Sequence, residues 1–348
     1  MIEIITIGID IGGYIKFSRK DIKIAIPNVI GSRTSGWSGL SSDESWINNL
    51  VLIQDGSEFF IGELARSQSD VKHFIMDQGR LDKIDEVFKL IKAVLPLISI
   101  EEEKDIVLAI GVPLSTSIEK MKELSRLKGP VAIKIKNEST DEIKEVELNL
   151  KQILVMPEAY GSYYYHVAKY HNSRTINALV ISLDLLTEIM TVVEGRIIRQ
   201  ASVNLTNASL FVLANKISLG LQQQTNQIIK PLSIMKNLRD NIDEVIISGK
   251  RYNITEIREH YIRQISQEIV DSIKNILNFL PLDLDIEYYI ITGEAVPIFW
   301  NEIEMLILTN NLIKDLDRIM VIKDHSFANA IGFELMGEKK ISTSKEDE

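Results

Sequence analysis

The sequence contains no cysteine among its 348 residues. Disulfide bonds, thiolate zinc sites, iron–sulfur clusters and a cysteine nucleophile are therefore excluded together. A chain without disulfides is typical of a reducing compartment, so we expect a cytoplasmic protein.

Histidine is also scarce, and acidic residues outnumber basic ones. None of the five histidines forms a metal-binding spacing such as H-E-x-x-H. The formal net charge of −10 opposes attraction to phosphate backbones, so we expect no direct binding to nucleic acid. No apolar run reaches the roughly 18 to 20 residues of a membrane span, and the first ten residues lack the basic region of a signal peptide. We therefore expect neither a membrane span nor a secretory leader.

A pattern of strands and turns occurs twice in the chain, whose length fits two domains. The apolar run at residues 4–9 ends at Asp10 and is followed by a Gly-Gly turn and two short strand-like segments. A similar run at 176–181 ends at Ser182, which is 172 residues beyond Asp10, and is again followed by a polar turn and strands. The pattern predicts an internal duplication, with two similar α/β lobes that face a shared cleft.

The first of these turns carries Asp10, Gly12, Gly13 and Lys16. A glycine turn after a buried strand can bring backbone N–H groups against a phosphate, while an aspartate holds a metal-bound water and a lysine neutralises charge. The same residues also fit a plain hairpin with a Gly-Gly turn and a strand-end aspartate. The residues alone leave both interpretations open.

Three later positions also have two interpretations. Glu158 follows Pro157 between a strand and a helix, where a carboxylate can orient a water molecule or simply favour the helix N-terminus. Gly293 follows an apolar strand and fits either a close approach to a nucleotide or an ordinary strand-to-helix turn. The segment 182–188 offers several oxygen ligands, Thr187 among them, but it contains no glycine and so makes a poor phosphate loop.

Taken in order, these motifs resemble those of the actin superfamily, and within it the ParM-like actins of plasmids and archaea. Residues 10–16 resemble the family's first phosphate motif, D-x-G-x-G-x-x-K, with one residue missing. The segment ILVMPEAYGSYYYH, which contains Glu158, resembles the strand and interdomain helix whose M-P-E or M-P-Q supplies the water-positioning residue. The segment SFANAIGF near the C-terminus resembles the family's F-A-N-A-x-G-Y, which begins the helix that returns to the first lobe.

The second lobe departs from the family's motifs. The adenosine motif is a run of glycines in the family, whereas here Gly293 is followed by Glu294, whose negative charge is an unfavourable neighbour for a nucleotide. The second phosphate motif is D-x-G-x-x-T-x-D in the family. Its first three fixed positions are occupied here by Ser182, Asp184 and Thr187, and Glu188 lies one position before the fourth.

The resemblance implies a duplicated actin-like ATPase fold of the ribonuclease H-like class, an α/β fold with two lobes around a nucleotide cleft. It implies a first lobe at residues 1–168 with 318–336 returning to it, and a second lobe at 169–317. We expect a disordered polar tail at 337–348. The implied ligands are ATP or ADP with Mg²⁺, with Asp10 holding the metal through water and Glu158 as the catalytic, water-positioning residue. Nucleotide contacts are implied for Asp10, Gly12, Gly13, Lys16, Thr187 and Gly293.

The implied function is that of an actin-like cytoskeletal or DNA-segregation protein, as in plasmid segregation, which polymerises with itself and works with an adaptor protein. The loop at 31–48, with Trp37 and Trp46, is a candidate self-contact and equally fits a loop that packs its own tryptophans. The altered second lobe keeps an alternative open: a nucleotide-independent actin-fold scaffold or pseudo-ATPase. Whether the chain is a weak ATP hydrolase is left open. A sugar kinase has no support, because no separate substrate motif is present.

Overall fold

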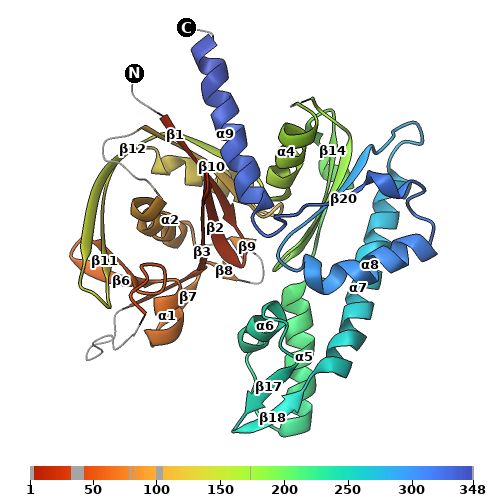
Figure 1. Cartoon of the computed structure of the whole chain (residues 1–348), viewed down its shortest axis with the longest axis horizontal. Helices are drawn as coiled ribbons and strands as arrows, with labels where there is room; N and C mark the ends of the chain where they lie inside the picture. The colour runs from red at the N-terminus through yellow and green to blue at the C-terminus, as the bar shows by residue number, and fades with distance from the viewer. Residues whose placement is uncertain are drawn as a thin grey trace. The chain divides into compact units, whose positions relative to one another are not determined.

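The computed structural model describes residues 4–32, 43–77, 80–81, 83–98, 105–172 and 174–346. The chain divides into two compact units (Figure 1). Unit 1 comprises Met1–Ala168 and Asn329–Glu348, and unit 2 comprises Lys169–Ala328. Trp37 of the predicted contact loop lies outside the described residues, whereas the Trp46 ring lies 4.5 Å from the ammonium group of Lys144.

The core of unit 1 is a mixed sheet, ten-stranded within the described residues, in which β1 (Ile4–Ile11) is buried almost throughout. β1 pairs in parallel with β10 (Asp105–Val112) and antiparallel with β2 (Tyr14–Arg19), and β10 pairs in parallel with β12 (Ile143–Pro157). An unbroken apolar run is typical of a strand covered on both faces. The other strands are β3 (Ile22–Pro27), β4 (Val29–Ser32), β5 (Leu50–Gln54), β6 (Ser57–Ile61), β7 (Lys72–Phe74) and β11 (Gly129–Asn137), while β8 (Met76–Asp77) and β9 (Arg80–Leu81) pair separately.

Helices cover this sheet. α2 (Ile84–Ile98) has an apolar stripe at helical spacing and contacts β5, β11 and β12. α4 (Ala159–Tyr170) follows β12 almost directly, so the end of that strand and the start of the helix share a short junction. The shorter helices are α1 (Glu63–Gln68) and α3 (Ile118–Leu124), the latter continued by a 3₁₀ turn at Ser125–Leu127.

Helix α9 (Ala328–Glu346) packs directly on β1 and β10 (Figure 1). A Cβ atom at Gly8 would lie 1.9 Å from the carbonyl oxygen of Ala330, and one at Gly111 would lie 2.3 Å from the Phe333 ring. The two strand glycines therefore leave the room that the helix occupies. Four isoleucines of β1 alternate with Gly8 and face the other side of the sheet: Ile5, Ile7, Ile9 and Ile11.

Two expectations about the C-terminal region differ from the structure. Residues 319–321, which the sequence assigned to the first lobe, form β20 (Ile319–Val321) in unit 2, and unit 1 resumes only at Asn329. The expected disorder from residue 337 is wrong for 337–346, because these residues continue α9. The polar composition of this segment concealed its contacts: Gly337 lies against Thr6 of β1, and Ile341 lines the same pocket as Ile4.

Unit 2 repeats the strand arrangement that opens unit 1. β13 (Ala178–Leu183) pairs antiparallel with β14 (Thr187–Val193) and in parallel with β19 (Tyr288–Thr292), just as β1 pairs with β2 and β10. β20 extends the sheet beside β19. The short strands β15 (Arg196–Ile197) and β16 (Val203–Leu205) pair with β14, and β17 (Glu244–Ile247) forms a separate hairpin with β18 (Lys250–Asn253).

The helices of unit 2 enclose one large apolar core. The helix bounds are α5 (Leu210–Thr225), α6 (Pro231–Arg239), α7 (Thr255–Phe279) and α8 (Val296–Thr309). Isoleucines at 265, 269 and 273 form the fully buried stripe of α7, which packs on α5 and α8. Helical spacing of apolar residues therefore accounts for the position of this long helix.

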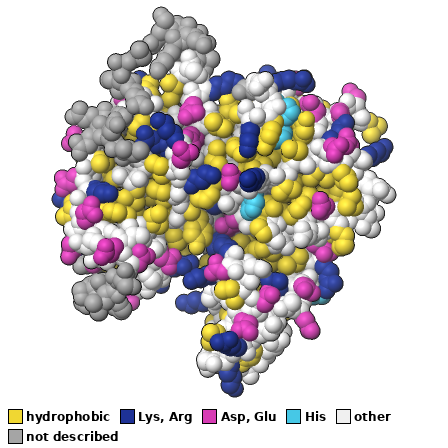
Figure 2. All heavy atoms as spheres, viewed as in Figure 1, with side chains coloured by type: hydrophobic (Ala, Val, Ile, Leu, Met, Phe, Trp, Pro, Cys, Tyr) yellow, Lys and Arg dark blue, Asp and Glu magenta, His cyan; other side chains and the backbone are white. Residues whose placement is uncertain are grey.

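The tip of unit 2 at β17 and β18 carries basic side chains on the face that Figure 2 shows. Lys250 and Arg251 are exposed there, and Arg251 pairs with Glu244 at 3.4 Å. The same hairpin carries the acidic Glu244, so the hairpin, all of which the structure describes, has no continuous basic surface. Among the helices that the structure describes, none combines the length and the hydropathy needed to cross a membrane.

Candidate functional site

The turn between β1 and β2 is held by hydrogen bonds on both sides. Asp10 lies opposite Lys16 in β2 and beside Gly111 in β10. The backbone N–H of Gly12 donates to the carbonyl of Tyr14 at 3.1 Å, and the Asn28 amide donates to the Gly12 carbonyl at 3.0 Å. The structure therefore confirms the predicted hairpin. The same hairpin holds in place the polar residues that a phosphate site would need.

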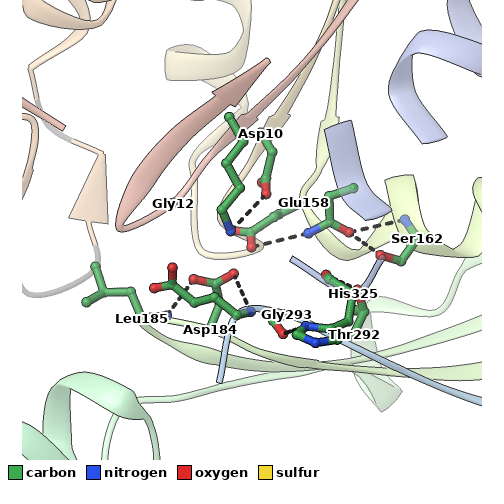
Figure 3. A network of polar contacts seen from close by, with 12 residues as sticks. Asp10, Gly12, Glu158, Ser162, Asp184, Leu185, Thr292, Gly293 and His325 are labelled. Atoms are coloured by element: carbon green, nitrogen blue, oxygen red, sulfur yellow. Dashed lines mark hydrogen bonds and ion pairs between the residues drawn. The ribbon is translucent and has the colours of Figure 1, made fainter. Parts of the chain in front are cut away.

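Asp10 and Lys16 form a buried ion pair. Their side chains are 1% and 3% exposed, and Lys16 Nζ lies 3.9 Å from Asp10 Oδ2 (Figure 3). Burying two charges is costly, and a pair of this length recovers only part of that cost. The free energy of folding therefore gives little reason for this buried ion pair, and binding of a charged ligand explains it better.

Glu158 lies at the junction of β12 and α4 and is 5% exposed. Its backbone N–H donates to the carbonyl of Val112 at 2.7 Å, which ties the junction to the end of β10. A carboxylate oxygen of Glu158 lies within 4.8 Å of one of Asp10. The structure thus brings together Asp10, Lys16 and Glu158 at the carboxyl ends of β1 and β12, as the sequence predicted for the first lobe.

A residue that sequence reasoning left without a role orients Glu158. Asn329, the second residue of α9, donates from Nδ2 to Glu158 Oε1 at 3.4 Å (Figure 3). Its Oδ1 accepts from the backbone N–H of Ser162 at 3.1 Å and from the Ser162 hydroxyl at 2.5 Å. Asn329 belongs to the segment SFANAIGF, so the signal was present, but only the tertiary structure links the segment to Glu158.

Two glycines allow α4 and α9 to cross closely enough for these bonds. A Cβ atom at Gly161 would lie 2.3 Å from the carbonyl oxygen of Asn329, and one at Gly332 would lie 1.7 Å from the carbonyl oxygen of Gly161. Both contacts are with backbone, which cannot move aside as a flexible side chain can. The position of Asn329 beside Glu158 therefore depends on glycine at both crossing points.

The donor set of unit 1 fits a divalent cation of the Mg²⁺ type. Mg²⁺ takes oxygen ligands and is bound through one or two carboxylates while it keeps several waters. Asp10 and Glu158 supply two buried carboxylates close together, and Lys16 supplies a fixed positive charge. This combination suits a metal-bound anionic ligand and a positioned water molecule.

The corresponding strand end of unit 2 carries Ser182, Asp184 and Thr187, all buried. Within the described part of the chain, the hydroxyl oxygens of Ser182 and Thr187 are buried and make no hydrogen bond. Asp184 accepts from the backbone N–H of Leu185 at 2.8 Å and from that of Glu294 at 3.4 Å (Figure 3). Asp184 thus stabilises its own loop, while the two hydroxyls remain available to a polar ligand.

Gly293 has a structural reason to be glycine. Its φ angle is +103°, and a Cβ atom there would lie 2.1 Å from the carbonyl oxygen of Leu183. Its backbone N–H donates to the carbonyl of His325 at 3.0 Å, and His325 Nδ1 lies 2.8 Å from the Gly293 carbonyl (Figure 3). The close approach of β13 explains this glycine without a ligand, so nucleotide contact at Gly293 stays a prediction.

The charge of Glu294 is compensated inside unit 2. Arg239 at the end of α6 donates from Nη2 to Glu294 Oε1 at 2.6 Å, and the two side chains are 19% and 11% exposed. The sequence predicts that the negative charge of Glu294 is an unfavourable neighbour for a nucleotide, and in the structure Arg239 neutralises this charge. A residue 55 positions away supplies the partner, which no local motif indicates.

Comparison with known proteins gives one family match. Residues 8–161, which include Asp10, Lys16 and Glu158, match the family model of the N-terminal domain of actin-like proteins. No curated protein matches the sequence.

The fold is similar to solved structures over nearly the whole chain. ParM in a 15-stranded filament from Clostridium botulinum is 18% identical, with a TM-score of 0.76 over 96% of this chain and 99% of that chain. The archaeal actin homologue Ta0583 is 19% identical, with a TM-score of 0.73 over 96% of this chain and 99% of that one. A crystal structure of Ta0583 in complex with ADP, at 18% identity and the same coverage, also gives a TM-score of 0.73.

Proposed function

Because the chain is an actin-like protein, with the family match over residues 8–161 and the actin-like fold over nearly its whole length, we propose that it assembles into filaments and binds a purine nucleotide with Mg²⁺. The resemblance indicates ATP or ADP as the nucleotide. The role would be cytoskeletal or in DNA segregation, in the cytoplasm, with a second copy of the chain as the principal partner and an adaptor protein as another. The observation that carries the proposal is the buried group of Asp10, Lys16 and Glu158 in the matched region.

Each residue of this group has a separate task in the proposal. Asp10 would hold Mg²⁺ through a water molecule, and Lys16 would neutralise phosphate charge. Gly13 would offer its backbone N–H group to a phosphate oxygen, whereas the N–H group of Gly12 donates to the carbonyl of Tyr14 and its proposed contact is the close approach that a glycine allows. Bound Mg²⁺ would supply further neutralisation of the charge on the nucleotide. Glu158, oriented by Asn329, accepts a hydrogen bond from the attacking water and so fixes its direction.

Two residues of unit 2 are further candidates for nucleotide contact. Thr187 is assigned a polar contact, for which its buried hydroxyl is suited. Gly293 is assigned a backbone contact next to the tight approach of Leu183.

A nucleotide-independent scaffold is the second candidate, and a specific observation favours it. Two unit 2 residues that stand where the family has glycines are satisfied by internal bonds: Asp184 by its own loop and Glu294 by Arg239. The fold of unit 2 therefore needs no nucleotide. Under this alternative the chain still assembles, but nucleotide has no effect on assembly.

Calorimetry and sedimentation distinguish the two candidates. We expect wild-type protein to bind ATP or GTP in the presence of MgCl₂ and to sediment in a nucleotide-dependent manner. Asp10→Ala should weaken binding at least about tenfold, since it removes the carboxylate that would accept hydrogen bonds from a Mg²⁺-bound water molecule. Glu158→Ala should slow phosphate release by about a hundredfold while assembly persists.

The control is Asp70→Ala, which removes an exposed carboxylate of unit 1 and should change neither quantity. Absence of any heat of binding at millimolar ATP and GTP would reject the nucleotide proposal. Assembly that is indifferent both to nucleotide and to Asp10→Ala would establish the scaffold instead.

A further inference from the structure

A pocket of about 250 Å³ lies inside unit 2, where α6, α7 and the start of α8 meet. Its apolar walls come from all three helices: Leu238 from α6, Ile262 from α7, and Pro297 and Ile298 from α8. The pocket is smaller than the roughly 300 to 1,000 Å³ of sites for drug-sized ligands, which suits one flat ring system better than a whole cofactor.

The Arg239–Glu294 ion pair lines this pocket. The pair is short, at 2.6 Å, and mostly shielded from water, so each charged group also interacts strongly with anything else that enters. Replacing such a pair with apolar residues is often neutral or stabilising, so stability is a weak reason for its presence. Arg258, the other cation of the pocket, is paired with Asp243.

The pocket adjoins the strand end that the proposed function assigns to the nucleotide. Glu294 directly follows Gly293, and its backbone N–H donates to Asp184 Oδ2 at 3.4 Å. The Glu294 backbone is therefore part of the loop at the ends of β13 and β19, while its side chain lines the pocket. A nucleotide held at this loop would have a flat base to place, and the pocket has apolar walls and a polar edge for one.

The chemistry of the pair distinguishes the two purines. A carboxylate only accepts hydrogen bonds, and a guanidinium only donates them. Guanine presents two adjacent donors, N1–H and the N2 amino group, beside the acceptor O6. A carboxylate can accept hydrogen bonds from both donors while a guanidinium donates one to O6. Adenine presents one amino donor beside the acceptor N1, so it offers the carboxylate a single bond. One charged hydrogen bond is thus made with guanine and missing with adenine.

We propose that the Arg239–Glu294 pair makes this pocket a base-recognition site that selects guanine nucleotides over adenine nucleotides. The inference rests on the proposed function, because it names the base of the nucleotide proposed there. Glu294 is the specificity-determining residue, and Arg239 both holds its carboxylate in place and serves the acceptor of the base.

Calorimetric titration with GTP and with ATP, each with MgCl₂, tests the proposal on the full chain. We expect wild-type protein to bind GTP at least about tenfold more tightly than ATP, since one bidentate contact discriminates between bases by about 1 to 3 kcal/mol. Glu294→Gln should abolish or reverse this preference, because an amide carries one donor and one acceptor and pairs well with adenine. The matched control is Glu244→Gln, which changes an exposed glutamate of the same unit and should leave the GTP-to-ATP ratio unchanged.

Arg239→Lys provides a second variant that keeps the charge but loses the planar donor fork. It should lower GTP affinity more than ATP affinity, and it keeps the proposal testable if Glu294→Gln fails to fold. ATP binding as tight as GTP binding in the wild type, or an unchanged ratio in a folded variant at either position, would overturn base selection and leave the proposed function intact. Binding of neither nucleotide would overturn both.

Discussion

Asn329 holds two different groups with the two ends of one amide. Its nitrogen donates to the Glu158 carboxylate, and its oxygen accepts from the backbone and hydroxyl of Ser162. Because the oxygen is committed to Ser162, the nitrogen is fixed in the orientation that faces Glu158. The direction of the proposed catalytic carboxylate is therefore set by a residue 171 positions away.

Removing this amide should separate hydrolysis from assembly. For Asn329→Ala we expect phosphate release to slow by about tenfold, because Glu158 loses the donor that orients it. The free energy of unfolding should fall by about 1 to 3 kcal/mol, because buried Ser162 loses its partner. Nucleotide-dependent sedimentation should persist. Phosphate release, sedimentation and denaturant unfolding measure these three effects.

Asn310→Ala is the matched control, since Asn310 is exposed and its amide bonds only to Leu306 of the same helix. An Asn329→Ala protein that hydrolyses nucleotide at the wild-type rate, while Glu158→Ala does not, would contradict the positioning role.

At the scale of elements, α9 joins the end of the chain to its beginning through a buried carboxylate. Glu334 accepts from the Ser18 hydroxyl at 2.7 Å and from the backbone N–H of Lys20, both on or next to β2. Burial raises the pKa of Glu334 above its ordinary value of 4.5, and these hydrogen bonds and nearby Arg19 only partly oppose the shift, to which Glu338 adds. The carboxyl group of Glu334, at the contact between α9 and the sheet, is therefore easier to bury when it is protonated.

The sign of this shift predicts how stability depends on pH. A carboxyl whose pKa is higher in the folded chain than in the unfolded chain binds more protons when folded. The contribution of this carboxyl group to the free energy of unfolding is fully present below about pH 4.5, and it is lost as the pH rises through the raised pKa. In Glu334→Gln, which is neutral at every pH, the free energy of unfolding should decline less over this interval than it does in the wild type.

Denaturant unfolding at a series of pH values between about 4 and 7 measures the effect. Glu304→Gln, at an exposed position of α8, should follow the wild-type curve. If Glu334→Gln also follows it, the carboxyl group does not titrate with folding and the prediction is wrong.

At the scale of the whole molecule, the net charge of −10 bears on self-assembly. Each subunit added to the proposed filament would bring further negative charge, and like charges closer than the Debye length, about 10 Å at 0.1 M salt and longer at lower salt, repel. We expect added salt to screen this repulsion and to lower the protein concentration at which filaments form. Light scattering at about 0.05 M and 0.3 M KCl, with MgCl₂ and nucleotide held constant, measures the critical concentration at each salt level. A higher critical concentration at high salt would show that attractive ion pairs, rather than net repulsion, dominate the contact.

Much of the fold follows from local patterns in the sequence. The apolar run that forms most of β1, the helical spacing in α2 and the repeat of the opening pattern at β13 all depend on residues close together in the chain. The end of the C-terminal helix did not follow, because the polar segment after Met336 is held by contacts with β1 rather than by its own apolar stripe. Residue composition is a poor guide to stabilisation by contacts with a distant strand.

The candidate site divides in the same way. Asp10 and Glu158 were found from their places at strand ends, and the structure brings them together because the carboxyl ends of parallel strands meet at one edge of the sheet. Lys16 was found in the turn motif, and the antiparallel pairing of β1 with β2 places it opposite Asp10. Asn329 and Arg239 were not assigned roles, because each acts on a residue far away in the sequence. For Gly293 the sequence left a nucleotide contact and an ordinary turn open, and the carbonyl of Leu183 alone requires a glycine there.

The sequence by itself determined the fold class, the duplicated strand pattern and the acidic and lysine residues of the first unit. These depend on hydrophobic periodicity and on residue types within a few positions of one another, which a single chain displays directly. Only the tertiary structure decided that Asn329 orients Glu158, that Arg239 neutralises Glu294, and that glycines on β1, β10 and α4 admit α9. The physical reason is that hydrogen bonds, ion pairs and steric fit act over a few ångströms in space, between residues that the sequence separates by 55 to 171 positions in the two polar pairs.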